Sequence, residues 1–127
     1  RLFNALQKGG RLIFDLEIFR GYEVGERSTE IVPLSATSGI LYESVAKSID
    51  WTRQKMTYLL SYEFIEKGIV KEKEYQQFVL YWYSVYEMIV RLEKIGFQNI
   101  TCSAHYTYLR ESDEQTKWVT IEAERPV

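Results

Sequence analysis

One histidine and one cysteine, His105 and Cys102, are the residues of this sequence whose types most often do catalytic or metal chemistry. A zinc site would need further ligands, and a cysteine–histidine catalytic pair would need its two side chains to face each other. A separation of three residues along a strand directs side chains to opposite faces. We therefore predict structural roles for both residues and no metal site.

An acid, Asp15, lies near the end of the apolar stretch LQKGGRLIFDL, residues 6–16. The continuous run Leu12–Phe14 is typical of a central parallel strand that helices cover on both faces. Open α/β sheets bind ligands beyond the carboxyl ends of such strands, so Asp15 could face an active-site crevice. It could equally cap a turn or anchor a loop, and the sequence leaves both roles open.

Tyrosines are the other candidates for ligand contacts, because they alternate along an apolar strand. One face of residues 56–64 carries Met56, Tyr58, Leu60, Tyr62 and Phe64. Aromatic residues at alternating positions usually form sheet core, and Tyr58 and Tyr62 could also form the roof of a pocket. This even-numbered face is too apolar to stay in water, so we expect the core or a partner to cover it.

The composition of the 127-residue chain, with 46% hydrophobic residues, is that of one compact domain. Its 16 basic and 18 acidic residues give a net charge of -2, so the basic field that nucleic-acid binding needs is missing. We expect no nucleic-acid partner. No segment has the pattern of a signal peptide or a membrane span, and the lone cysteine cannot form an internal disulfide. We therefore expect a cytoplasmic protein with no membrane partner.

Periodicity and turn residues predict the order of helices and strands. Ser84 and Glu87 form a capping box at the start of the most regular helix, and Gly96 ends it. In chain order we expect a helix that stops at Gly9 or Gly10, a strand over 11–16, a loop over 17–38, antiparallel strands over 39–49, 56–64 and 69–83, the capped helix, and strands over 98–106 and 117–124.

This order resembles the carboxyl half of a class I S-adenosylmethionine-dependent methyltransferase, over the whole chain. LQKGGRLIFDL resembles the family's phrase of leucine, any residue, proline or similar, two glycines and a hydrophobic strand ending in aspartate, which marks the fifth strand of its sheet. YSVYEMIVRLEKIGF and the two strands after it resemble the family's usual ending. The three antiparallel strands resemble the substrate-covering insertion of small-molecule methyltransferases.

The resemblance also concerns the tyrosines before the capped helix. Related enzymes with such an insertion often carry an arginine and a tyrosine in a phrase that ends in tyrosine-serine or tyrosine-threonine. Tyr83 matches this phrase, and Tyr81 departs from it. The candidate substrate-binding residues are therefore Asp15, Tyr58, Tyr62, Tyr81 and Tyr83, and no catalytic residue is identified.

The resemblance implies an α/β fold: an incomplete Rossmann-like sheet made of its last three strands, with an inserted three-stranded antiparallel meander. Residues 1–38 would hold the helix end, the fifth strand and a loop, 39–83 the insertion, and 84–127 the last helix and two strands. The parent enzyme would transfer a methyl group from S-adenosylmethionine to a small molecule. The family's cofactor site follows its first two strands, whereas Gly9 and Gly10 precede a strand. We expect an inactive fragment without cofactor.

A non-enzymatic α+β module that binds a ligand or dimerises is the alternative reading. The first helix has no capping residue before it, which favours the fragment instead. As a fragment, the strand over 11–16 would pair with the last strand on one side. Its other side would keep unpaired backbone groups, so we expect the chain to form a homo-oligomer.

Overall fold

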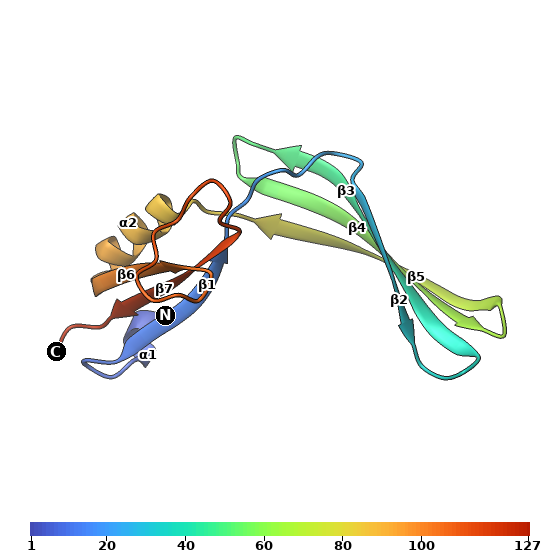
Figure 1. The fold of residues 1–127 in the computed structure, drawn as a ribbon, viewed down its shortest axis with the longest axis horizontal. Helices are drawn as coiled ribbons and strands as arrows, with labels where there is room; N and C mark the ends of the chain where they lie inside the picture. The colour runs from blue at the N-terminus through green and yellow to red at the C-terminus, as the bar shows by residue number, and fades with distance from the viewer. The chain divides into compact units, whose positions relative to one another are not determined.

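A computed structural model describes residues 1–127, and the chain divides into two compact units (Figure 1). Unit 1 comprises Arg1–Arg20 and Tyr83–Val127, and unit 2 comprises Gly21–Trp82. Neither helix has the length and apolar composition that crossing a membrane requires. The elements in chain order are α1 (Leu2–Ala5), β1 (Arg11–Glu17), β2 (Arg27–Pro33), β3 (Ser38–Asp50), β4 (Lys55–Glu66), β5 (Ile69–Tyr81), α2 (Val85–Ile95), β6 (Gln98–Ala104) and β7 (Trp118–Glu124).

The sheet of unit 1 has three antiparallel strands in the order β1-β7-β6 (Figure 1). β7 is the central strand, and its odd-numbered residues from Val119 to Ala123 are buried. Residues of both helical segments pack on this buried side, so α1 and α2 cover the same face of the sheet. The core consists of Leu92, Phe97, Val119, Ile121 and Ala123, and the half-buried residues packed on it include Phe3, Leu6, Val85 and Met88.

Helix α2 has the termini that the sequence predicts. The Ser84 hydroxyl accepts a hydrogen bond from the Glu87 backbone N–H at 3.1 Å, and the Glu87 carboxylate accepts one from the Ser84 backbone N–H at 2.8 Å. Gly96 ends the helix at φ 109, a backbone conformation that favours glycine. The capping box and the stop at Gly96 are therefore confirmed. The first helix was predicted to stop at Gly9 or Gly10, but α1 ends at Ala5, and Gly9, at φ 74, instead takes a left-handed turn before β1.

The strand predicted over residues 11–16 is present as β1, and within this chain it lies at the edge of an antiparallel sheet with only one face covered. β1 pairs with β7 alone, in the antiparallel sense, which confirms the predicted partner. Leu12 and Phe14 pack on the core, whereas Ile13 points to the other face and is 61% exposed. The apolar run Leu12–Phe14 is typical of a strand that is covered on both faces. In this chain, however, both helices lie on the same face of the sheet. Taken by itself the chain has two antiparallel sheets and few helices, not the parallel sheet of an α/β fold.

The sheet of unit 2 has four antiparallel strands in the order β2-β3-β4-β5 (Figure 1). Three of its strands are confirmed: β3, β4 and β5 correspond to the strands predicted over 39–49, 56–64 and 69–83. The sheet has a fourth strand, β2, which the predicted three-stranded meander did not include. β2 lies within the predicted loop over 17–38 and pairs with β3. All seven of its residues are exposed, so no alternation of buried and exposed positions marked it in the sequence. Its proline stands at the last position of an edge strand, where a missing N–H is tolerated.

Buried residues are few in unit 2, although its strands are long. β3 and β5 have 13 residues each and β4 has 12. Ala46 and Met56 are at most 1% exposed, and Leu60 is 9% exposed. The compact unit begins at Gly21, whereas the sequence predicts that the insertion begins at residue 39. The difference consists of β2 and the segment that leads to it.

Candidate functional site

The two faces of the unit 2 sheet carry different kinds of side chain. Directly opposite residues of antiparallel strands point to the same face, so the register assigns each residue to a face. The even-numbered residues 56–64 of β4 share their face with even-numbered residues 40–46 of β3 and 72–80 of β5. We call this the aromatic face, because it carries Tyr42, Tyr58, Tyr62, Phe64 and Phe78.

A groove runs over the aromatic face. It has a volume of ≈ 340 Å³ and is lined by Tyr42, Ser44, Tyr58, Leu60 and Phe78. No lining residue is charged, so the groove suits an apolar or planar part of a small molecule. The burial expected for this face is found at Leu60, but Phe78 remains 45% exposed. Aromatic surface is therefore available for a ligand within unit 2.

The tyrosines Tyr42 and Tyr62 form a ring pair on the aromatic face. Their ring centroids are 5.2 Å apart and the planes are tilted by 45°. The two residues lie directly opposite each other in the register of β3 and β4. Such a pair is fixed by its strands and offers a preformed surface for stacking.

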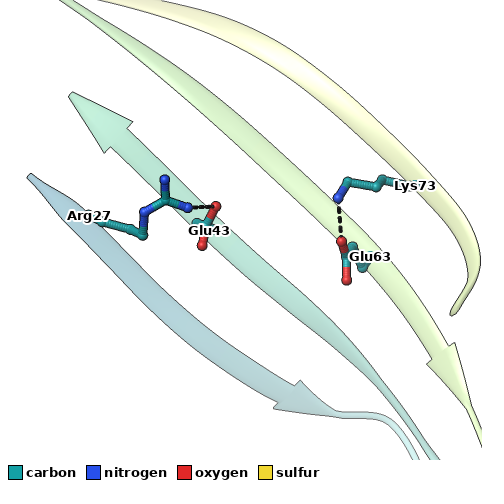
Figure 2. A network of polar contacts seen from close by, with 4 residues as sticks. All are labelled: Arg27, Glu43, Glu63 and Lys73. Atoms are coloured by element: carbon teal, nitrogen blue, oxygen red, sulfur yellow. Dashed lines mark hydrogen bonds and ion pairs between the residues drawn. The ribbon is translucent and has the colours of Figure 1, made fainter. Parts of the chain in front are cut away.

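The opposite face of the same sheet carries charged residues, four of which form two ion pairs. Arg27 donates to Glu43 at 2.6 Å, and Lys73 donates to Glu63 at 2.5 Å (Figure 2). The hydrogen bond to Glu63, and a further one to Tyr75, raise the pKa of Lys73. These neutralised pairs leave little charge for a ligand, so the aromatic face is the better candidate for binding.

A larger hollow, of ≈ 590 Å³, lies at the hairpin ends of unit 2. Its apolar lining comes from Ile31, Pro33, Leu41 and Ile65, and Lys67 is its one charged lining residue. It contains no acid or base beyond this lysine and no aromatic ring. For this reason its size alone does not make it the candidate site.

A second polar cluster surrounds Asp15 in unit 1. The Asp15 carboxylate accepts hydrogen bonds from the Thr120 hydroxyl at 2.7 Å and the Tyr106 hydroxyl at 2.9 Å. The bond to Asp15 raises the pKa of Tyr106. Trp118 lies beside this cluster, with its ring centroid 5.8 Å from that of Tyr106 and 4.8 Å from that of His105. Asp15 thus anchors the loop between β6 and β7, which is one of the two roles that the sequence left open.

The backbone of that loop is strained. His105, Tyr106 and Leu109 have φ values of 47, 60 and 58, which non-glycine residues rarely adopt. Hydrogen bonds hold the loop in place: the Leu109 backbone N–H donates to the Ser103 hydroxyl at 2.9 Å. Strain of this kind persists where the surrounding contacts enforce it.

Two of the five predicted site residues, Tyr58 and Tyr62, lie together on the aromatic face. The sequence reasoning missed Tyr42 and Phe78, which complete that face from the neighbouring strands. Alternation along β4 identified the residues that this strand places on the aromatic face. The residues that lie beside them on β3 and β5 depend on the register between the strands. Tyr106 was missed because its loop shows no periodicity.

The other three predicted residues lie elsewhere. Tyr81 is opposite Lys55, on the face away from Tyr58, and Tyr83 belongs to unit 1, as does Asp15. The guanidinium of Arg91 lies 4.9 Å from the centre of the Tyr83 ring, so this tyrosine packs on α2. These positions do not test whether any of the five residues contacts a substrate. Their role in binding stays a prediction.

Cys102 and His105 occupy separate environments. Cys102 lies opposite Ile121 on the helix-covered side of β6, and burial raises the pKa of its thiol. His105 follows the end of β6, and its Nε2 accepts a hydrogen bond from the Lys117 backbone N–H at 3.0 Å. His105 thus holds the loop, and Cys102 lies at the core.

The residues present do not fit an S-adenosylmethionine site of the family's kind. That site needs a strand followed by a glycine-rich turn and a helix, where backbone N–H groups approach the cofactor. The one strand-to-helix connection in this chain runs from β5 to α2 through Trp82, Tyr83 and Ser84, without a glycine. The chain therefore offers no such turn.

The fold is similar to a solved methyltransferase structure. The crystal structure of an S-adenosylmethionine-dependent methyltransferase from Clostridium acetobutylicum ATCC 824 matches 99% of this chain with a TM-score of 0.68 and 15% sequence identity. The match covers 48% of that protein, so the chain spans about half its length. No family model and no curated protein matches the sequence. The likeness confirms the prediction that the chain has a methyltransferase-like fold.

Proposed function

We propose that this chain is the carboxyl half of an S-adenosylmethionine-dependent methyltransferase that acts on a small molecule. The observation that carries the proposal is the likeness along 99% of the chain to one half of such an enzyme. In this proposal unit 1 supplies the last three strands of the methyltransferase sheet. Unit 2 is the substrate-covering insertion.

The aromatic face would bind the methyl acceptor. Its groove of ≈ 340 Å³ is lined by aromatic and apolar residues, and its polar side-chain groups are the hydroxyls of Tyr42, Ser44 and Tyr58. Methyl transfer proceeds largely through alignment of the acceptor with the methyl group and exclusion of water, so few acid or base groups are required. An aromatic surface fixed on long strands supplies that alignment.

The cofactor would be held by residues outside this chain. The support is the missing glycine-rich turn, together with the 48% of the methyltransferase that the match covers. The 127-residue chain should therefore bind no S-adenosylmethionine and transfer no methyl group by itself.

Calorimetry and a transfer assay test this proposal. Titration of the isolated chain with S-adenosylmethionine should give no heat, whereas a complex with a Kd near 1 μM would release about 8 kcal/mol of binding free energy and would contradict the proposal. The full-length product of the gene should transfer radiolabelled methyl groups to small-molecule acceptors. A full-length product that binds no S-adenosylmethionine would remove the enzymatic reading.

A further inference from the structure

Four residues form a row across the aromatic face. Glu30 lies opposite Tyr42, Tyr42 opposite Tyr62, and Tyr62 opposite Glu74, so the row crosses all four strands. The two tyrosine rings at its centre are 5.2 Å apart. A glutamate on each edge strand flanks the ring pair, and the two glutamates are three strand spacings apart, or about 14 Å.

Charge is segregated between the two faces of the sheet. A further glutamate, Glu72, lies opposite Phe64 on the aromatic face. The basic residues placed by the register, Arg27, Lys55 and Lys73, lie on the opposite face. The ion pairs of this sheet are also on that face, and the flanking glutamates of the row have none. The aromatic face therefore combines partly exposed rings with negative charge that no lysine or arginine neutralises.

This combination fits an organic cation. The faces of aromatic rings attract a cation, and nearby carboxylates add Coulomb attraction. A metal ion is a poor fit, because carboxylates about 14 Å apart cannot share one small ion. An anionic ligand is excluded from this face by repulsion from Glu30, Glu72 and Glu74.

We propose that the row Glu30–Tyr42–Tyr62–Glu74 binds the ammonium group of an amine. The cation lies over the Tyr42 and Tyr62 rings, the flanking glutamates attract it, and the adjoining groove takes the apolar remainder of the molecule. The inference rests on the proposed function, since it makes the methyl acceptor a molecule that carries an ammonium group. Binding itself requires neither the cofactor nor methyl transfer, so it can be measured on this chain.

Tetramethylammonium chloride is the probe, and tert-butanol is its uncharged counterpart of similar shape. Each is titrated into the ¹⁵N-labelled chain at an ionic strength held constant with sodium chloride. Amide shifts should change on β3 and β4 around Tyr42 and Tyr62 with tetramethylammonium and not with tert-butanol. The double variant Glu30→Gln/Glu74→Gln should weaken binding about tenfold, because each exposed carboxylate contributes modestly.

The matched control is the double variant Glu43→Gln/Glu63→Gln, which removes the same charge from the opposite face of the same sheet. It should leave tetramethylammonium binding within about twofold of the unchanged protein, because these carboxylates lie on the far face of the sheet and are already paired with Arg27 and Lys73. The variant Tyr62→Phe keeps the ring and should bind as well as the unchanged chain. Equal weakening by both double variants, equal binding of tert-butanol, or no binding of either probe would overturn the inference. Each outcome is independent of the cofactor titration, so the proposed function is tested separately.

Discussion

Replacing Tyr62 by alanine measures how open the aromatic face is. The Tyr62 side chain is half-buried, and its ring contacts the Tyr42 ring at a centroid distance of 5.2 Å. A half-buried tyrosine removes about 100 Å² from water, which at about 25 cal/mol per Å² corresponds to about 2 kcal/mol after allowance for a compact unfolded state. Tyr62→Ala should therefore lower the free energy of unfolding of unit 2 by about 2 kcal/mol.

The fully buried Met56 provides the comparison within the same strand. Met56 is 0% exposed, and Met56→Ala should cost about 3 to 4 kcal/mol. The double variant Tyr42→Ala/Tyr62→Ala should cost less than the sum of the two single changes, by about 1 kcal/mol, because the ring pair is lost only once.

Urea denaturation followed by tryptophan fluorescence is the assay. The chain has two compact units, so a signal from one unit is needed. Of the three tryptophans, Trp51 and Trp82 lie in unit 2, with ring centroids 5.6 Å apart. A Trp118→Phe background therefore reports unit 2 alone.

Two results would refute this reasoning. A loss of about 4 kcal/mol for Tyr62→Ala, the value for a fully buried ring, would mean that another part of the protein covers the aromatic face. No coupling between the Tyr42 and Tyr62 substitutions would mean that the rings do not touch in solution. Either result would remove the surface on which the proposed ligand site depends.

Three further predictions concern unit 1. Ser84→Ala should lower the free energy of unfolding of unit 1 by about 1 kcal/mol, because the capping box is lost. Trp118 fluorescence in a Trp51→Phe/Trp82→Phe background measures this change. An unchanged free energy of unfolding would show that α2 needs no cap. The raised pKa of Tyr106 predicts stability that is fully present below pH about 10 and is lost as the pH rises through the folded pKa. Absorbance at 295 nm should show one late-titrating tyrosine that Tyr106→Phe abolishes, and an unchanged titration curve would contradict the bond to Asp15. The unpaired outer edge of β1 should make the isolated chain self-associate, and a stable monomer at tens of micromolar in sedimentation equilibrium would be evidence against it.

Local sequence signals determined several elements of this protein. The capping box and Gly96 fixed both ends of α2, because these contacts lie within one turn of the helix. Alternation along β4 placed Tyr58 and Tyr62 on one face, since successive side chains of a strand point to opposite sides. These features depend on neighbours in the chain and could be read without the fold.

β2 and the coverage of β1 by helices could not be predicted in the same way. β2 is exposed along its whole length, so its residues carry no burial pattern. The run Leu12–Phe14 fits a strand covered on both faces and equally an edge strand with one exposed isoleucine. Only the packing of α1 and α2 on the same side of the sheet decided between them.

The candidate site itself was decided by tertiary structure. Glu30, Tyr42, Tyr62 and Glu74 are spread over 45 positions of the chain and share a row only through the registers of three strand pairs. A shift of one residue in any of those registers would turn a member of the row to the other face. Each strand's own pattern fixes which residues share a face, but the hydrogen bonds between strands fix which residues meet across the sheet.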